Sequence, residues 1–359
     1  MQPIMREHIT LIDVGPSSMR FYCCHRAQVI TYEIDEIGGR AIPLADGRRP
    51  LQQILECLAI PDLAPMDLAA FFQGLIDDKI FRDAASDSKV EFPPNYEARL
   101  KRQLVYFSGL APAGQTARDL QHRLLRSRVL IVGAGGGGSH MAVQLAGVGV
   151  GNLTIADHDR VEIGNLGRQI FYADHIGELK VEVLRSVIGK ISPETSVTTH
   201  VERLTREAGW INKILPNVDL VINCADYPSM DETSRWLFDA CYPLRIPLIP
   251  AGGYNGHMTS VPPTLIPGRS TCWHCYERTT AKKVSPFGEL RLAEMKSGVF
   301  LPATVAMAAL QMPEIIRVLT GCEQPRFINC RGEFDINACA LRIENVPPTP
   351  GCGTCEGTA

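Results

Sequence analysis

The pattern of apolar and polar positions changes character along the chain. Near the N-terminus, residues 8–14, 19–24 and 29–34 alternate or run apolar over lengths typical of short strands. The Gly15-Pro-Ser-Ser break between the first two favours a turn at that point. We therefore expect three short strands at the start of the chain.

Helical periodicity follows these strands. Residues 50–59 and 65–81 carry apolar positions at helical spacing, and each segment opens on a proline near its first turn. Three short strands with helices are similar to a winged-helix module, which we place at residues 1–90. Residues 91–98, with Pro93 and Pro94, predict a linker after this module.

The remainder, residues 99–359, alternates between strands and helices. Val129–Val132 and Leu153–Ala156 are apolar runs of the length of buried strands, with a helical segment at residues 141–145 between them. Such alternation predicts an α/β fold, in which a doubly wound, mostly parallel, Rossmann-like sheet carries helices on both faces.

Composition narrows the classes of function. The 359 residues suffice for two domains, the net charge is −3, and 45% of the residues are hydrophobic. No apolar run approaches the ~20 residues that span a bilayer, and the N-terminus lacks a signal-peptide pattern. We expect a cytoplasmic protein without a membrane partner, whose 12 cysteines are thiols or metal ligands and not disulfides.

The charge of the N-terminal module argues against nucleic acid. Residues 1–90 hold nine Lys and Arg against thirteen Asp and Glu, a net charge of −4. The helix that would enter a groove carries Asp67, Asp77 and Asp78, which is the opposite of what phosphates attract. A peptide that pairs with the edge of the small sheet suits this module better. A purely structural extension is the alternative.

A glycine-rich loop follows the first strand of the α/β region. Gly133, Gly135 and Gly138 form the pattern G-x-G-x-x-G, and Gly136 lies within it. Asp157 ends the next apolar strand, nineteen residues past Gly138, where an acid commonly binds ribose hydroxyls. On these residues alone, a dinucleotide such as NAD is the natural ligand.

Polar residues further along favour ATP instead. Asn165, Arg168 and Lys180 follow the ribose acid, in positions from which they could fold back over phosphates. A pyrophosphate is largely satisfied by backbone N–H groups and the helix dipole. A triphosphate under attack develops more charge, which fixed cations stabilise. The alternative is a dinucleotide fold with ordinary surface cations.

An acid also follows a third apolar run. Residues 219–226 form an apolar strand that ends in Asp226, at the sheet edge where ligands bind in doubly wound folds. Asp226 is placed to hold Mg²⁺, which takes few protein carboxylates and bridges phosphates. A helix N-cap is the alternative. Arg102 precedes the first strand of the sheet and by itself is an ordinary surface cation.

Four cysteines form two C-x-x-C pairs. Cys272 and Cys275 make the first pair, and Cys352 and Cys355 make the second, with 76 residues between the pairs. Each pair can place two thiolates on one metal, and together they complete a tetrahedral Zn²⁺ site with no open position. We expect a structural zinc, with redox pairs as the alternative. His274 lies inside the first pair and is not an expected ligand, because four cysteines suffice.

From about residue 99 to residue 355 the chain resembles the adenylating-enzyme family of ThiF, MoeB and the ubiquitin-activating enzymes. The matching segments are, in chain order, RLKRQ, VGAGGGGSH, IADHDRVEIGNLGRQ, the Lys180 that follows, the NCAD strand end and the two cysteine pairs. The resemblance implies a homodimer that binds Mg-ATP, adenylates a carboxylate and releases pyrophosphate.

The same resemblance implies roles for the polar residues named above. Catalysis would depend on positioning and charge neutralisation and not on a protein nucleophile. Arg102 would reach across the dimer as an arginine finger. The other implied contacts are the nucleotide for Gly136, the ribose for Asp157, the phosphates for Asn165, Arg168 and Lys180, and the metal for Asp226.

Two features indicate a peptide substrate within this family. Members that conjugate ubiquitin-like proteins or load sulfur use a cysteine after the first zinc pair, but residues 276–321 contain none. Cys224 and Cys241 lie in or near apolar segments, and we expect them to be core thiols. An N-terminal module before the adenylating region is similar to the layout of the MccB-like and PaaA-like members, which modify ribosomally made precursor peptides. The segment Phe300–Thr304 matches the MccB-like pattern.

The expected function is ATP-dependent activation of a carboxylate on a precursor peptide whose leader the N-terminal module binds. Dehydrative cyclisation or a related modification in antibiotic biosynthesis would follow. Residues 279–297 would line the peptide channel or form a solvated loop. The alternatives are MoeB-like adenylation of the C-terminus of a ubiquitin-fold sulfur carrier and a non-catalytic peptide-binding scaffold.

Overall fold

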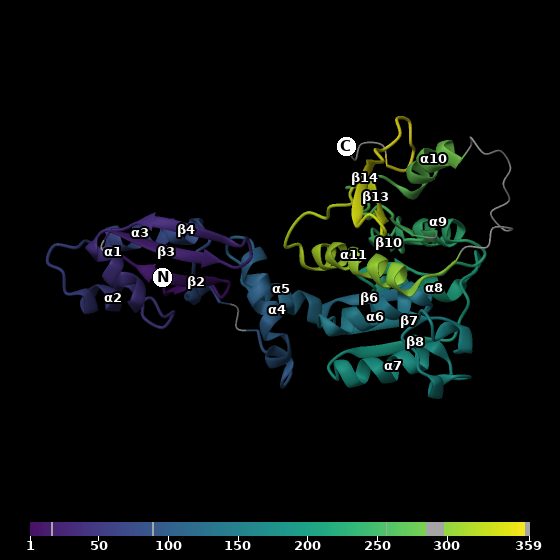
Figure 1. The fold of residues 1–359 in the computed structure, drawn as a ribbon, viewed down its shortest axis with the longest axis horizontal. Coiled ribbons are helices and arrows are strands. Elements are labelled where there is room, and N and C mark those ends of the chain that lie inside the picture. The colour runs from purple at the N-terminus through teal and green to yellow at the C-terminus, as the bar shows by residue number, and fades with distance from the viewer. Residues whose placement is uncertain (16, 88–89, 256, 285–297, 356–359) are drawn as a thin grey trace. The chain divides into compact units, whose positions relative to one another are not determined.

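The chain packs into two compact units, residues 1–122 and 123–359, in the computed structural model (Figure 1). The structure describes residues 1–15, 17–87, 90–255, 257–284 and 298–355. Most of the segment 279–297, for which a channel or a solvated loop is predicted, lies outside the described residues. Each unit is described separately below.

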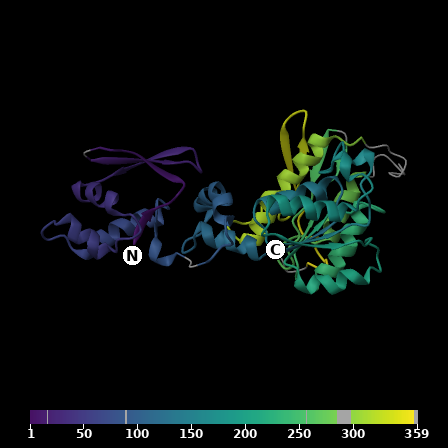
Figure 2. The same cartoon turned by 90° about the horizontal axis from the view of Figure 1, so that it is seen from below.

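The first unit begins with a small antiparallel sheet, in the order β2-β3-β4. Its strands are β2 (Ile9–Val14), β3 (Ser18–Cys23) and β4 (Gln28–Glu33), which confirms the three predicted strands. Successive side chains of a strand point to opposite faces, and in β3 Met19, Phe21 and Cys23 are buried while the residues between them are not. Figure 2 shows the strands of this unit as a layer over its helices.

Three helices cover the buried face of that sheet. They are α1 (Glu36–Ala41), α2 (Leu51–Leu58) and α3 (Pro65–Asp77). Ile54 and Leu58 of α2 and Leu68, Phe72 and Leu75 of α3 join the β3 side chains in one apolar core. The helical spacing of these residues is what the sequence pattern detects.

The prediction that the second helix runs to Phe81 is wrong. Helix α3 ends at Asp77 because Lys79 adopts a left-handed conformation, with φ of 62°, and Ile80 N–H donates to the carbonyl of Leu75 at 2.9 Å. Phe81 instead begins strand β5 (Phe81–Asp83), which pairs antiparallel with β1 (Pro3–Met5). Both Ile80 and Phe81 are buried. The apolar pattern therefore continues beyond the end of α3, and the sequence gives no sign that the helix ends there.

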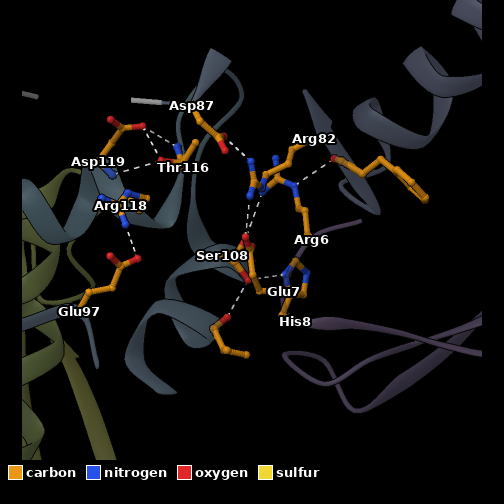
Figure 3. Close-up of polar contacts among 12 residues, drawn as sticks. Arg6, Glu7, His8, Arg82, Asp87, Glu97, Ser108, Thr116, Arg118 and Asp119 are labelled. Carbon is orange, nitrogen blue, oxygen red and sulfur yellow. Dashed lines mark hydrogen bonds and ion pairs between the residues drawn. The ribbon is translucent and has the colours of Figure 1, made fainter. Parts of the chain in front are cut away.

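Buried polar contacts hold helix α4 (Tyr96–Leu110) against the strands of the first unit (Figure 3). The Arg6 guanidinium donates to the carbonyl oxygens of Phe81 at 3.2 Å and Ser108 at 3.0 Å. The His8 ring Nδ1 and the Ser108 hydroxyl lie 2.9 Å apart. Helix α4, which carries Arg102, is therefore part of the same compact unit as the N-terminal strands.

We expect the first unit to lose stability as the pH falls from 6.5 to 4. Burial and the nearby charge of Arg6 lower the pKa of His8 from its usual value to about 4, with a further lowering by His25 and an opposing effect of Glu7. Unfolded His8 would gain a proton near pH 6.5 and folded His8 only near pH 4, so acid favours the unfolded state. At ~1.36 kcal/mol per pKa unit, the loss reaches up to about 3 kcal/mol.

Hydrogen–deuterium exchange of residues 8–24 at several pH values would measure this loss. Tryptophan fluorescence would not report it, because Trp210, Trp236 and Trp273 all lie in the second unit. The control is His8→Asn, whose amide can replace Nδ1 but does not titrate. An equally steep pH dependence in that variant would assign the effect to other groups.

The second unit is built on a five-stranded parallel sheet in the order β10-β9-β6-β7-β8. A five-stranded parallel sheet within an α/β unit agrees with the predicted fold class. The strands are β6 (Arg128–Val132), β7 (Asn152–Ala156), β8 (Ser196–His200), β9 (Leu220–Asn223) and β10 (Leu248–Pro250).

Helices cover both faces of this sheet. Leu130 and Val132 of β6 pack in one cluster with Leu237 and Phe238 of α9, while the alternate residues of β6 are buried on the other face. On that other face α6 contacts β6, α7 and α11, and Figure 1 shows α6 and α7 beside β6, β7 and β8. The helices of this unit are α6 (Gly136–Gly147), α7 (Lys180–Ile191), α8 (Gly209–Ile214), α9 (Met230–Cys241), α10 (Trp273–Val284) and α11 (Leu301–Thr320). Helix α5 (Ala117–Arg126) includes the boundary between the two units.

A second, antiparallel sheet completes this unit and is absent from the sequence-based expectations. Its order is β11-β12-β13-β14, with strands β11 (Tyr254–Asn255), β12 (Met258–Val261), β13 (Cys330–Asp335) and β14 (Ala340–Asn345). Helix α11 packs against β12.

Short helical turns occur in both units. Single-turn 3₁₀ helices lie at Ile42–Leu44, Ala84–Ser86, Ile163–Asn165, Ala173–His175 and Leu215–Asn217. In the described part of the chain, no helix is long and apolar enough to cross a membrane.

Candidate active site

A cavity of about 640 Å³ opens at the carboxyl ends of the parallel strands. The loops after β6, β7, β8, β9 and β10 all contribute to its wall, together with the first residue of α7 and Met307 of α11. Parallel strands present these ends along one edge, which is the usual position of ligands in open α/β sheets. The volume is that of a typical small-molecule site.

The glycine loop after β6 shapes the floor of this cavity. Gly133 has a φ of 95°, and a Cβ there would lie 2.5 Å from the carbonyl oxygen of Cys224. Gly135 and Gly136 line the cavity as well, and α6 starts at Gly136 with no side-chain cap on its first N–H groups. Free N–H groups at a helix N-terminus are suited to bind phosphate.

Gly138 has a different position from the other three glycines. It is not among the residues that line the cavity. A Cβ on Gly138 would lie 1.8 Å from the carbonyl oxygen of Gly133, so this glycine allows the first turn of α6 to pack under the loop. The structure therefore gives Gly138 a role in shaping the loop.

Asp157 connects the glycine loop to the end of β7. Its carboxylate accepts hydrogen bonds from the backbone N–H groups of Ala134 at 2.6 Å and Asp159 at 2.8 Å. Asp157 lines the cavity and is only 9% exposed. The carboxylate thus fixes both loops at the wall of the cavity.

Lys180 and Asp159 form an ion pair in the cavity wall. The Lys180 Nζ lies 2.8 Å from Asp159 Oδ2, and Lys180 is only 6% exposed. Burial opposes ionisation of Asp159, but the hydrogen bond and charge of Lys180 outweigh it, so the pKa of Asp159 lies below its usual value. The ammonium group is therefore held in place before any phosphate arrives.

Asn165 and Arg168 reach the cavity from the 3₁₀ turn that follows β7. The Asn165 side chain accepts from the backbone N–H of Glu162 at 2.9 Å and so closes the turn. Arg168 donates to the carbonyl of Gly164 at 2.6 Å and is half-buried. Both residues line the cavity. The fold thus brings them to the same cavity as Asp157 and Lys180.

Asp226 also lines the cavity, three residues beyond the end of β9. The expected strand to Asp226 is too long, because the strand ends at Asn223, whose amide donates to Thr233 Oγ1 at 3.0 Å and Ser234 Oγ at 2.8 Å. The N-cap alternative for Asp226 is also wrong, since Ser229 caps α9 by accepting from the N–H of Glu232. Asp226 therefore remains an exposed carboxylate at the cavity.

The structure places Arg102 on α4, in the first unit. Several residues that the sequence reasoning does not single out also line the cavity, among them Asp159, Arg203 and Tyr227. Asp159 and Arg203 each follow the end of a parallel strand. Asp157 was predicted because it follows an apolar strand, and the same criterion applied to the other strands would have selected Asp159 and Arg203.

The sequence predicts two further cysteines, Cys224 and Cys241, to be core thiols. Cys241 is buried in the core, which confirms the prediction of a core thiol, whereas Cys224 lines the cavity. Burial and the charge of Asp226 raise the pKa of Cys224 to about 12. A thiol that stays protonated at neutral pH is a poor nucleophile.

The four predicted zinc ligands come together in the core of the second unit. Their sulfur atoms all lie within 4.8 Å of one another, with Cys272 and Cys352 at 3.6 Å and Cys275 and Cys355 at 3.6 Å. Four sulfurs at ~2.3 Å from a tetrahedral zinc would be about 3.8 Å apart. His274 lies outside this group, with Nε2 at 3.5 Å from Asp239. The donor set fits zinc.

Two bacterial adenylyltransferases are similar to about two thirds of this chain. The chain is 34% identical over 248 residues to the sulfur carrier protein ThiS adenylyltransferase of Escherichia coli K12, a match that covers 67% of this chain and 91% of that protein. It is 31% identical over 241 residues to the molybdopterin-synthase adenylyltransferase of Salmonella typhimurium LT2, covering 66% of this chain and 89% of that protein.

Two solved structures are similar over almost the whole chain. E. coli MccB with ATP has a TM-score of 0.72 at 22% identity, covering 99% of this chain and 100% of that one. PaaA has a TM-score of 0.74 at 22% identity, covering 95% of this chain and 99% of that one. At these identities the likeness is one of fold.

The nucleotide cavity, its fixed cations and these relatives define the class of the protein. It is an ATP-dependent adenylating enzyme, which excludes the non-catalytic scaffold. The sequence model of the ThiF family matches residues 101–354, and the chain belongs to the ThiF family.

Proposed function

We propose that this enzyme adenylates a carboxylate on a ribosomally made precursor peptide. Residues 1–90 would form a winged-helix-like module that binds the leader of the peptide. After the linker at 91–98, residues 99–359 would form the adenylation domain. The enzyme would act in the cytoplasm, in the biosynthesis of a peptide antibiotic.

The observation that carries this proposal is the difference in coverage between two groups of relatives. About 90% of the ThiS and molybdopterin-synthase adenylyltransferases matches only 66–67% of this chain. Their matches leave a third of the chain without a counterpart. MccB and PaaA instead correspond to 99% and 95% of the chain, so their fold includes the N-terminal module.

The N-terminal sheet offers an edge for a peptide. β2 and β4 are its edge strands, and apolar side chains are exposed on them, including Ile12, Val14 and Val29. An extended peptide can add a strand to such an edge through main-chain hydrogen bonds, with apolar side chains giving selectivity. E. coli MccB has also been solved with AMPCPP and MccA together. This supports the proposal that one enzyme of this fold binds a nucleotide and a second molecule at the same time.

In the proposed reaction, a peptide carboxylate oxygen attacks the α-phosphorus of ATP. The bond from the α-phosphorus to the bridging oxygen breaks, and pyrophosphate leaves as the acyl adenylate forms. Arg168 and Lys180 would neutralise the phosphate charge, and Asn165 and the Gly133–Gly136 loop would orient the nucleotide. Asp226 would hold Mg²⁺, which would neutralise negative charge on the phosphates.

We further propose that the enzyme is a homodimer in which Arg102 of one subunit serves the site of the other. Beside the cavity, the segment from β7 to α7 exposes Ile163 (78%), Tyr172 (63%) and Ile176 (47%). Exposed apolar groups this close together on one segment suit an interface. The cavity of the second unit is lined by Arg168 and Lys180, and we propose that Arg102 of a partner subunit would supply a third cation there.

The four-cysteine cluster would hold a structural zinc. The zinc would join the chain after β10 to the C-terminal tail and leave no ligand position for chemistry. Since the Cys224 thiol is protonated at neutral pH, the acyl adenylate would be captured by a peptide nitrogen or carbon. Dehydrative cyclisation of an acidic side chain is the preferred outcome, as in the PaaA-like members.

A direct test is to incubate the enzyme with ATP and the short peptide encoded beside its gene. We expect pyrophosphate release and a peptide that has lost water or gained a nucleotide by mass spectrometry. The matched control is the same peptide without its leader. Its turnover should fall strongly, because residues 1–90 would then have no leader to bind. An unchanged full-length peptide would contradict the proposal.

The 34% identity to a sulfur-carrier adenylyltransferase supports one alternative substrate, the C-terminus of a ubiquitin-fold sulfur carrier. Adenylation of such a carrier, together with no reaction of the peptide, would establish this alternative. Replacement of Ile12 and Val29, which are exposed on the edge strands β2 and β4, with Asp distinguishes the two further. It would lower peptide turnover on our proposal but leave carrier adenylation intact on the alternative.

A further inference from the structure

Arg203 and Tyr227 form a contact at the rim of the nucleotide cavity. The guanidinium carbon of Arg203 lies 3.9 Å from the centre of the Tyr227 ring. Both residues line the cavity, and both are exposed. A guanidinium over an aromatic face at this distance is an attractive cation–π contact.

The strands that carry these two residues are not neighbours. Arg203 follows β8 and Tyr227 follows β9, and β6 and β7 lie between those strands in the sheet. At about 4.8 Å per strand, the two strand ends are on the order of 14 Å apart. The contact therefore crosses the edge of the sheet where the glycine loop and Asp157 lie.

The Arg203 side of the contact has a fixed backbone. The Trp210 indole N–H donates to the Arg203 carbonyl at 3.3 Å, and the Trp210 ring stacks on His200 with an interplanar angle of 16°. Leu204, the next residue, is buried in the core. Because the backbone at Arg203 is fixed, its side chain can restrain the loop that carries Tyr227.

The Tyr227 side is held only at its ends. Ala225 is fixed by its N–H to Asn223 at 3.0 Å and by its carbonyl, which accepts from Thr233 at 2.6 Å. Ser229 is fixed as the cap of α9. Among the described residues, Asp226 and Tyr227 make no hydrogen bond, so the Arg203 contact is a side-chain restraint on this short span.

We propose that Arg203 and Tyr227 form a clasp across the nucleotide cavity that positions Asp226 over bound ATP. The clasp is the pair of these two side chains, and both are positioning residues because they act through the Asp226 segment. The contact keeps the loops after β8 and β9 together over the nucleotide. The inference rests on the proposed role of Asp226 as the magnesium ligand.

Binding of AMPCPP with Mg²⁺, measured by titration calorimetry on the full-length protein, tests the clasp without any peptide substrate. We expect Tyr227→Ala and Arg203→Ala each to weaken binding by roughly five-fold, which is the strength of a partly exposed cation–π contact. The double variant should be no weaker than either single variant, because both changes remove one interaction. Tyr227→Phe keeps the ring and is the matched control, with binding within two-fold of the wild type.

The magnesium requirement tests whether the clasp acts through Asp226. We expect Tyr227→Ala to raise the Mg²⁺ concentration for half-maximal AMPCPP binding, and to have no further effect when Asp226 is already alanine. Additive effects of the two clasp variants, or a Tyr227→Phe variant as weak as Tyr227→Ala, would overturn the clasp. An Asp226→Ala variant with an unchanged Mg²⁺ requirement would instead refute the role of Asp226, and the additivity test would still decide whether the clasp exists.

Discussion

Replacement of Asp226 with alanine is expected to lower the rate of adenylation by on the order of 100- to 1000-fold, the usual effect of removing one group that stabilises the transition state. Asp226 is an exposed carboxylate at the cavity, and its backbone lies between two anchored points, Ala225 and Ser229. Among the described residues, the Asp226 side chain makes no hydrogen bond or ion pair. The variant should therefore fold normally and bind the peptide as the wild type does.

Pyrophosphate release at saturating ATP and varied Mg²⁺ would measure this effect. Asp226→Asn separates charge from size, and we expect it to be nearly as inactive as alanine because Mg²⁺ requires the carboxylate. Asp239→Asn is a matched control on α9, since Asp239 does not line the cavity. Turnover retained by Asp226→Ala would refute the assignment of Asp226 to the metal.

Loss of the zinc ligands should give the largest effect on stability. The four cysteines are at most 4% exposed and pack in one cluster with Leu237, Phe238 and Trp273. Without metal, four thiols would remain in contact in an apolar core. Chelation, or replacement of Cys352 with serine, is expected to destabilise the second unit by several kcal/mol, because metal binding energy contributes directly to folding.

Metal analysis and Trp273 fluorescence would measure this loss together. Trp273 is buried beside the cluster, so its emission should move to longer wavelength as the site opens. Cys339→Ser is the control, because Cys339 is exposed and lies outside the cluster. Purified protein without bound zinc, whose four thiols react freely while the fold is intact, would contradict the proposed structural metal.

The regular elements of this protein could largely be predicted from its sequence. The three N-terminal strands, the strands at Val129–Val132 and Leu153–Ala156 and the helices before and after them follow from apolar periodicity. The end of α3 could not, because Ile80 and Phe81 are as buried as the helix residues before them. The antiparallel sheet β11-β14 was missed for a related reason, since short strands far apart in sequence give a weak local signal.

The candidate site was predictable where a residue follows a strand within a known pattern. Asp157, Asn165, Arg168, Lys180 and Asp226 all line one cavity in the structure. Asp159 and Arg203 were not singled out, although each follows a parallel strand, because one charged residue after a strand is common. Tyr227 could not be found in the sequence at all, since its partner is 24 residues away on a strand that is not adjacent to its own.

The sequence by itself determined the class of fold, the family, the nucleotide chemistry and the four cysteines that would bind zinc. These properties depend on residue types at fixed spacing, and spacing is local information. The tertiary structure alone decided that Gly138 shapes the loop and does not line the cavity, that Ser229 caps α9 in place of Asp226, and that Arg203 meets Tyr227 across the sheet edge. Each of these depends on the order of strands in the sheet, which brings distant segments to one edge and which no local pattern specifies.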